Sequence, residues 1–234
     1  MSEDHLSFYR RWNRLAKPYF SWQFEQFSSY LGQRVADIGC GPGNLVPQLM
    51  DRELYLGVDG DQDMLREIEA AYGNEKSVMV IHQDVTLPEL TTKLKEYDID
   101  SVLCMNLIAH LEDDVGALKI MVDALPVGGA LALLVPAMPG LFGSLDELDN
   151  FHRRYTKASL LGKLGRLPLR VEKISHFNTI GALGWWWKSR ILRSVEHDDN
   201  NYTIMNSLIP ILRPIEKFMS PPFGLSLIVV AHKI

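Results

Sequence analysis

Residues 35–45, which read Val-Ala-Asp-Ile-Gly-Cys-Gly-Pro-Gly-Asn-Leu, decide the fold of this chain. The first four predict a buried strand, and the glycines after them predict a tight turn that opens a helix. Glycine suits such a turn because a Cβ would forbid both the dihedral angles and the close approach of a ligand to the backbone. The turn holds no Lys or Arg, and an acid, Asp37, stands at the end of the strand. The stretch therefore favours a ligand with an amine or a sulfonium over one with a pyrophosphate.

The spacing of the glycines separates this loop from two phosphate-binding motifs. A dinucleotide fingerprint would place its third glycine at position 44, which is Asn44, and the Gly-Lys-Ser/Thr ending of a P-loop is absent. The pattern Asp37-x-Gly39-x-Gly41-x-Gly43 resembles motif I of the class I S-adenosylmethionine-dependent methyltransferases.

Strand and helix patterns alternate after the loop, as a parallel sheet requires. Further strands are predicted at 54–58, 77–81, 101–104, 130–135, 169–177 and 225–232. The resemblance implies that the last strand enters antiparallel between the fifth and the sixth. We therefore expect an α/β fold, a doubly wound, mostly parallel sheet of the Rossmann-like methyltransferase type.

Length and composition favour one domain over 1–234, since 234 residues with 47% hydrophobic and 23% charged residues can bury a sizeable core. Its expected parts are an N-terminal helical cap (1–32), a cofactor-binding core (33–178), a helical insertion (179–223) and the last strand (224–234).

The net charge, the two cysteines and the N-terminal sequence indicate which partners and which cellular compartment to expect. A net charge of -5 gives no reason to expect a nucleic acid partner. The spacing of Cys40 and Cys104 matches neither a disulfide framework nor a zinc site, so free thiols in a reducing cytosol are expected. The N-terminus lacks the pattern of a signal sequence, and no run of about 18 uncharged apolar residues occurs. We expect a soluble, cytoplasmic protein without a transmembrane segment.

The resemblance assigns cofactor contacts beyond the glycines. A carboxylate at the end of the second strand, Asp59, suits the two vicinal hydroxyls of a ribose. The family pattern places Asp84 on the amine of adenine and Met64 against its ring. S-adenosylmethionine, and its product S-adenosylhomocysteine, are thereby expected to contact Asp37, Gly39, Cys40, Gly41, Gly43, Asp59, Gly60, Met64, Asp84, Val85 and Asn106.

Residues 105–114 follow the fourth strand and should face the methyl group, since ligands of open α/β sheets bind outside the carboxyl ends of the strands. The family's Asn-Val-Leu-Glu-His pattern has Ala109 in place of Glu here. His110 is the first candidate for a catalytic proton acceptor and His152 the second, because histidine titrates near neutral pH. The acids at 112–114 favour helix capping over metal binding, and no metal is expected.

Three aromatic residues are candidates for acceptor binding: Tyr19, Tyr155 and Trp186. Tyr19 belongs to an aromatic-rich N-terminal region whose plainer interpretation is packing against the sheet. Tyr155 ends a long connection, 136–155, in which Arg153 and Arg154 have nearby acids at 146, 147 and 149 as alternative partners.

The insertion carries Trp186 between two further tryptophans and admits three interpretations. It is a lid over the acceptor, which we favour, a packed element, or a surface that contacts a bilayer peripherally. A membrane span is excluded by Lys188, Arg190 and Arg193, which interrupt the apolar run.

The function that follows is transfer of a methyl group from S-adenosylmethionine to a small or lipid-like acceptor, with oxygen as the first choice of accepting atom. The alternatives are N- or C-methylation and a non-catalytic module that only binds the cofactor. A nucleotide-dependent oxidoreductase is disfavoured by the glycine spacing and by Asp84.

Overall fold

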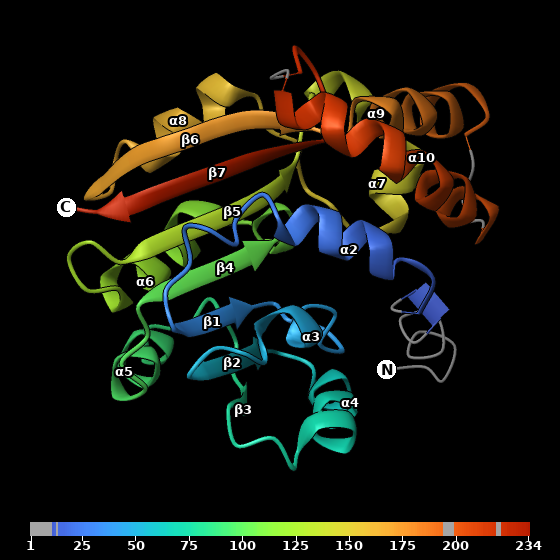
Figure 1. The fold of residues 1–234 in the computed structure, drawn as a ribbon. Helices are drawn as coiled ribbons and strands as arrows, with labels where there is room; N and C mark the ends of the chain where they lie inside the picture. Colours follow the sequence, from blue (N-terminus) through green and yellow to red (C-terminus); the bar gives the residue numbers. More distant parts are fainter. Residues whose placement is uncertain (1–10, 13, 194–198, 219–220) are drawn as a thin grey trace.

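The computed structural model describes residues 11–12, 14–193, 199–218 and 221–234 (Figure 1). Within them, a 7-stranded sheet has the order β3-β2-β1-β4-β5-β7-β6. The strands are β1 (Arg34–Ile38), β2 (Leu54–Asp59), β3 (Val78–His82), β4 (Ser101–Met105), β5 (Ala130–Pro136), β6 (Leu169–Phe177) and β7 (Ser226–Lys233). All neighbours are parallel except β7, which is antiparallel to both β5 and β6. The expected fold is confirmed.

Helices cover both faces of the sheet. One face carries α5 (Glu89–Glu96), α6 (Asp114–Ala124) and α8 (Lys157–Leu164), and the other carries α2 (Lys17–Phe24), α3 (Val46–Leu49), α4 (Gln62–Tyr72) and α10 (Asp199–Phe218). Shorter elements are η1 (Leu107–His110), η2 (Pro139–Leu141), α7 (Ser144–Leu148), α9 (Thr179–Trp186) and η3 (Trp187–Ile191). The sheet is therefore the middle of three layers.

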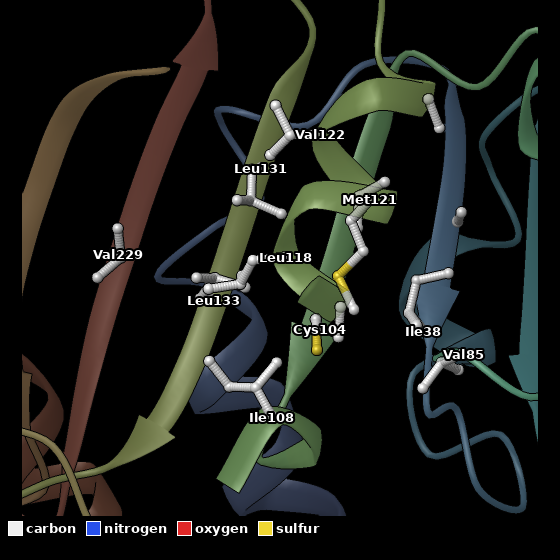
Figure 2. Close-up of a cluster of buried hydrophobic side chains, with 14 of the residues drawn as sticks. Ile38, Val85, Cys104, Ile108, Leu118, Met121, Val122, Leu131, Leu133 and Val229 are labelled. Atoms are coloured by element: carbon white, nitrogen blue, oxygen red, sulfur yellow. The ribbon is translucent and has the colours of Figure 1, made fainter. Parts of the chain in front are cut away.

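The central strands are apolar on both faces because both are covered. Every residue of β5 is buried. On the α6 side, Leu118 and Met121 belong to the same buried cluster as Cys104 and Leu133 of the strands (Figure 2). This packing holds the carboxyl ends of the strands in fixed positions, where a site can form.

The N-terminal aromatics largely serve packing. Phe20, Trp22 and Phe27 are buried in the cluster on the α2 face of the sheet, which confirms the plainer interpretation for these three residues. Pro18 lies in the first turn of α2, where an N–H is not needed. Residues 1–10 of the expected cap lie outside the described residues.

The connection between β5 and α8 contains the short helices η2 and α7, where the sequence pattern predicted only a loop. A buried ion pair anchors it: the Arg154 guanidinium donates to Asp146 Oδ1 at 2.6 Å, and the two side chains are 1% and 0% exposed. Arg154 also donates to the carbonyl of Ala137, and the Trp185 indole donates to Asp146 Oδ2. The pair thus joins the connection to the insertion.

The insertion folds as α9 and η3, which are continuous in sequence, followed by α10. The carboxylate of Glu216 in α10 accepts the N–H groups of Asn178 and Thr179 and so caps the start of α9. Figure 1 shows α7, α9 and α10 beside the end of the sheet to which the β4 and β5 arrows point. Among the described residues, no helix has both the length and the apolar character needed to cross a bilayer.

Replacing Arg154 with Met should lower the free energy of unfolding by about 3–5 kcal/mol, because it leaves the Asp146 carboxylate buried without its charged partner. Denaturant unfolding measures the change. The matched control is Arg66→Met, which breaks an exposed arginine–aspartate pair with Asp63 and should cost about 0–1 kcal/mol. Equal losses in the two variants would show that burial of the Arg154 pair has no energetic consequence.

Candidate active site

A cleft of about 490 Å³ opens at the carboxyl ends of the parallel strands. It lies where the loops after β1, β2, β3 and β4 meet, which is the usual ligand position in open α/β sheets. Its lining consists of Gly39, Asp59, Gly60, Asp61, His82, Gln83, Asp84, Val85 and Leu107. No Lys or Arg is among these lining residues, so the cleft is built without a phosphate-binding cation.

The glycine loop has the left-handed backbone that its sequence predicts. Gly39, Gly41 and Gly43 have φ angles of +76°, +53° and +81°. A Cβ at Gly39 would lie 3.1 Å from Leu107, and one at Gly43 would lie 2.8 Å from Ile68. A Cβ at Gly41 would meet nothing within 4 Å. The first and third glycines are therefore needed for close packing, whereas the second keeps open space beside the backbone.

Asp59 connects the end of β2 to this loop. Its Oδ2 accepts the N–H of Gly41 at 2.8 Å, and its Oδ1 accepts the N–H of Asp61 at 2.9 Å. Burial raises the pKa of Asp59 above its ordinary value, and the backbone hydrogen bonds oppose that rise. Each oxygen keeps a second acceptor site. The carboxylate can therefore hold the loop and still receive two hydroxyl groups from the cleft.

A second carboxylate, Asp84, lies in the loop after β3, which forms one wall of the cleft. It is exposed and accepts both the N–H and the hydroxyl of Thr86, at 2.8 and 2.7 Å. These two bonds lower the pKa of Asp84. Val85, next to it, is buried. This wall therefore presents an ionised acceptor beside an apolar side chain.

Four lining residues were not among the expected cofactor contacts: Asp61, His82, Gln83 and Leu107. Asp61 is the N-cap of α4, since it accepts the N–H of Asp63 at 2.9 Å. His82 lies at the carboxyl end of β3, Gln83 follows it, and the imidazole of His82 is 3.0 Å from the carbonyl of Gly60. Their place at a strand end is the sequence signal that could have identified them.

Several expected contacts lie outside the lining. Gly41, Gly43, Cys40 and Met64 belong to the loop or to α4, and the last two are buried. Asp37 is 3% exposed, and its Oδ2 accepts the Tyr55 hydroxyl at 3.1 Å. Burial raises the pKa of Asp37 to about 7, the bond from Tyr55 opposes this rise, and the charge of Asp59 adds to it.

The two candidate histidines lie on segments that run side by side. The N–H of His152 donates to the carbonyl of Ala109 at 2.9 Å, and the imidazole Nδ1 of His110 is 3.3 Å from the carbonyl of Asn150. Neither histidine lines the cleft, although Leu107, three residues before His110, does. Burial lowers the pKa of His110, whose ring packs 4.6 Å from that of Phe151 between centroids. The imidazole is therefore neutral near pH 7.

The backbone of Asn106 turns the chain between the end of β4 and η1. Asn106 has a left-handed backbone with φ of +61° and immediately precedes η1, and its N–H donates to the carbonyl of Leu134 at 2.7 Å. The chain therefore turns sharply at the end of β4, which places Leu107 against the glycine loop.

The three acceptor candidates occupy different environments. Tyr155 is buried in the core, where its hydroxyl donates to Asp114 Oδ2 at 2.7 Å. Tyr19 receives a hydrogen bond from the amide of Asn178 at 3.1 Å, and burial raises its pKa to about 12. Trp186 is 43% exposed on α9. The structure does not bring these three side chains together.

The acids after η1 have structural partners. Asp113 is the N-cap of α6 and accepts the N–H of Gly116 at 2.8 Å, which confirms the expected cap. Asp114 pairs with Lys163 at 2.8 Å and with Arg153 at 3.1 Å. In the part of the chain that the structure describes, no group of three or more His, Cys, Asp or Glu is placed to hold a metal ion.

Residues 36–133 match the family model of the methyltransferase domain. Two curated relatives match about the same share of the chain. The trans-aconitate 2-methyltransferase of Rhodopseudomonas palustris is 32% identical over 107 residues, 44% of this chain and 39% of that protein. The ubiquinone biosynthesis O-methyltransferase of Aeromonas salmonicida is 26% identical over 110 residues, 46% of this chain and 45% of that protein. The matches thus span less than half the length of either relative.

The fold extends further than the sequence similarity. A SAM-dependent methyltransferase from Archaeoglobus fulgidus superposes with a TM-score of 0.61 at 19% identity, over 94% of each chain. At this identity the likeness concerns the fold alone, and it includes elements outside residues 36–133.

The buried Asp37 makes the free energy of unfolding depend on pH. An unfolded carboxyl titrates near 3.8 and the folded one near 7, so the native protein loses stability as pH rises between these values. Asp37→Asn removes the titration. We expect the stability difference, variant minus wild type, to increase from pH 4 to pH 7 and then level off, with an upper bound of about 1.4 kcal/mol per pH unit.

Urea unfolding at several pH values measures this difference. Asp51→Asn is the control, because it makes the same substitution at a side chain that is 81% exposed. A flat profile for Asp37→Asn would mean that Asp37 is ionised in the native protein well below pH 7.

Proposed function

We propose that this chain is a class I S-adenosylmethionine-dependent methyltransferase and that it transfers the methyl group to an oxygen of a small or lipid-like acceptor. The observation that carries the proposal is a single cleft in which the glycine loop and the carboxylates of Asp59 and Asp84 meet. A cofactor with a positive charge and two ribose hydroxyls fits a cleft lined by acids and lacking a lining cation.

Each part of the cleft has a role in holding the cofactor. Asp59 receives the ribose hydroxyls, Asp84 accepts from the adenine amine, and Val85 packs beside the base. Gly41 leaves room for the methionine end beside the backbone, since a Cβ there would point into open space. The buried Asp37 lies behind the same loop and favours a cationic ligand in front of it, because an added positive charge lowers the free energy of its ionised form.

Alignment of the reacting groups carries much of the catalysis. The cofactor supplies an already activated methyl group on its sulfonium, so that holding the acceptor oxygen about 3 Å from it gives much of the rate. His110 accepts the proton of an acceptor hydroxyl, since its lowered pKa keeps the imidazole neutral near pH 7. His152 lies on the adjoining segment as the second candidate.

The names of two relatives and the exposure of Trp186 support a small or lipid-like acceptor. The two relatives named above carry names that refer to a small organic acid and to ubiquinone biosynthesis, and one is an O-methyltransferase by name. Trp186 on α9 is the acceptor candidate that stays exposed, whereas Tyr155 is buried, Tyr19 is half-buried, and both hydroxyls are held by hydrogen bonds. Methylation of nitrogen or carbon, and binding without turnover, remain the alternatives. Labelled S-adenosylmethionine and a fractionated extract of the protein's own cell separate an enzyme from a binding module, because only an enzyme transfers label, and the labelled product then identifies the methylated atom.

Asp59→Ala should weaken S-adenosylhomocysteine binding about ten- to a hundredfold, because hydrogen bonds to a charged acceptor are worth about 1.5–3 kcal/mol. Calorimetry measures the affinity. Asp59→Asn keeps one acceptor oxygen and should lose less, while Asp51→Ala, an exposed acid elsewhere, should lose nothing. A folded Asp59→Ala variant with unchanged affinity would remove Asp59 from the site.

His110→Gln should lower turnover about a hundred- to ten-thousandfold if the imidazole takes a proton, with cofactor affinity unchanged. The wild-type rate should fall as pH drops through the pKa of His110, which lies below 6.5, and the variant should lack this fall. His152→Gln is the comparison. If His110→Gln keeps the full rate and the wild-type pH profile, the role of His110 as a base is wrong and alignment alone must suffice.

A further inference from the structure

The outward face of α9 and η3 is apolar. Residues at intervals of three or four along these helices lie on one face, and here that face carries Ile180, Leu183, Trp187 and Ile191, which are 39%, 53%, 54% and 49% exposed. Trp186 and Leu192 flank this stripe with 43% and 58% exposure. We call these six residues the α9 face. A contiguous apolar surface of this kind on a folded domain marks a place of contact.

The opposite side of the same helices is firmly held, so the α9 face is fixed toward solvent. Ala182 and Ser189 are each 2% exposed. The Ser189 hydroxyl accepts the N–H of Leu145 at 3.4 Å, and its carbonyl accepts the hydroxyl of Ser144 at 3.2 Å. The Trp185 indole donates to the buried Asp146. Rotation of the helix to bury the α9 face would break all of these contacts.

The helices that carry the α9 face bear cations and no acid. Residues 179–193 contain Lys188, Arg190 and Arg193, and the next acids along the chain are Glu196, Asp198 and Asp199. Arg190 and Arg193 are exposed. Tryptophans that are exposed beside arginines match the boundary between acyl chains and anionic headgroups, where the ring lies at headgroup level and the cations meet phosphates.

We propose that the α9 face docks on the surface of an anionic phospholipid bilayer. The apolar side chains enter the headgroup region, and Arg190 and Arg193 contact the negative headgroups. In α10, Ile204, Ile211 and Ile215 are also 59%, 60% and 49% exposed, and they add a second apolar stripe in the same insertion. The proposal does not depend on methyl transfer, because it requires neither the cofactor nor the acceptor.

Vesicle sedimentation of the full chain, without cofactor, tests the proposal. We expect binding to vesicles of phosphatidylcholine with a quarter phosphatidylglycerol, much weaker binding to phosphatidylcholine alone, and a loss of binding as sodium chloride is raised. Binding that is equal for the two compositions, or absent from both, would overturn the proposal without any variant and would leave the proposed function untouched.

Two variants separate the apolar and the electrostatic parts. Leu183→Ser/Trp187→Ser should weaken binding at least about tenfold, because less apolar surface is buried. Arg193→Glu should weaken it about 25-fold, since the substitution changes the charge by two units and each charge near an anionic surface contributes about a factor of five. The matched controls are Met79→Ser/Val127→Ser and Arg166→Glu, which make the same kinds of change at exposed positions elsewhere and should bind like the wild type.

Circular dichroism establishes whether each variant is folded. If the double variant unfolds, Arg193→Glu and the salt series still test whether the α9 face binds an anionic bilayer. Wild-type affinity in folded Leu183→Ser/Trp187→Ser would overturn the proposal. Sedimentation equilibrium without lipid tests whether a second copy of the chain binds the α9 face instead. A wild-type dimer that Trp187→Ser converts to a monomer would assign the face to that second copy and would overturn the bilayer proposal.

Discussion

The hydrogen bond from the N–H of Gly41 to the carboxylate of Asp59 is the interaction on which the cleft depends. It joins the turn after β1 to the end of β2, and the carbonyl of Val58 adds to the connection by accepting the N–H of Gly39 at 2.8 Å. The turn adopts this position because three glycines take left-handed backbone angles, which other residues rarely adopt, and because a Cβ at Gly39 or Gly43 would crowd a neighbouring side chain. One carboxylate thus shapes the loop and faces the cleft, so that the preformed site needs little rearrangement to receive a ligand.

The sequence predicted the sheet well because the signals of its strands are local. Runs of apolar residues mark strands that are covered on both faces, and glycine or an acid after a run marks its carboxyl end. This rule selected Asp59, whereas Asp84 was selected by the resemblance to the family pattern, and both line the cleft. The same rule could have been applied to His82 and Gln83, which also follow a strand, but neither residue type suggests a particular ligand group by itself.

Other parts of the site depend on partners that are distant in the chain. Tyr155 looked like an acceptor contact because it ends a long connection, yet its hydroxyl meets Asp114, 41 positions away. The pairing of Arg154 with Asp146 was one of three open choices, and no local pattern selects it. Trp186 and Trp187 face outward because the opposite side of their helices contacts α7. Sequence periodicity could not predict this orientation, since nearly every residue from 180 to 187 is apolar or small.

The antiparallel entry of β7 has a consequence for the order in which the molecule can be completed during synthesis. Residues 226–233 pair with β5 on one side and with β6 on the other, so these two strands cannot join the same sheet until β7 has been made. While the ribosome is still adding the insertion, β5 and β6 each present an unpaired edge, and such edges invite pairing with other chains. The five strands β1 to β5 can therefore pair with one another before β7 exists, whereas the other edge of the sheet can close only after residues 226–233 have been made.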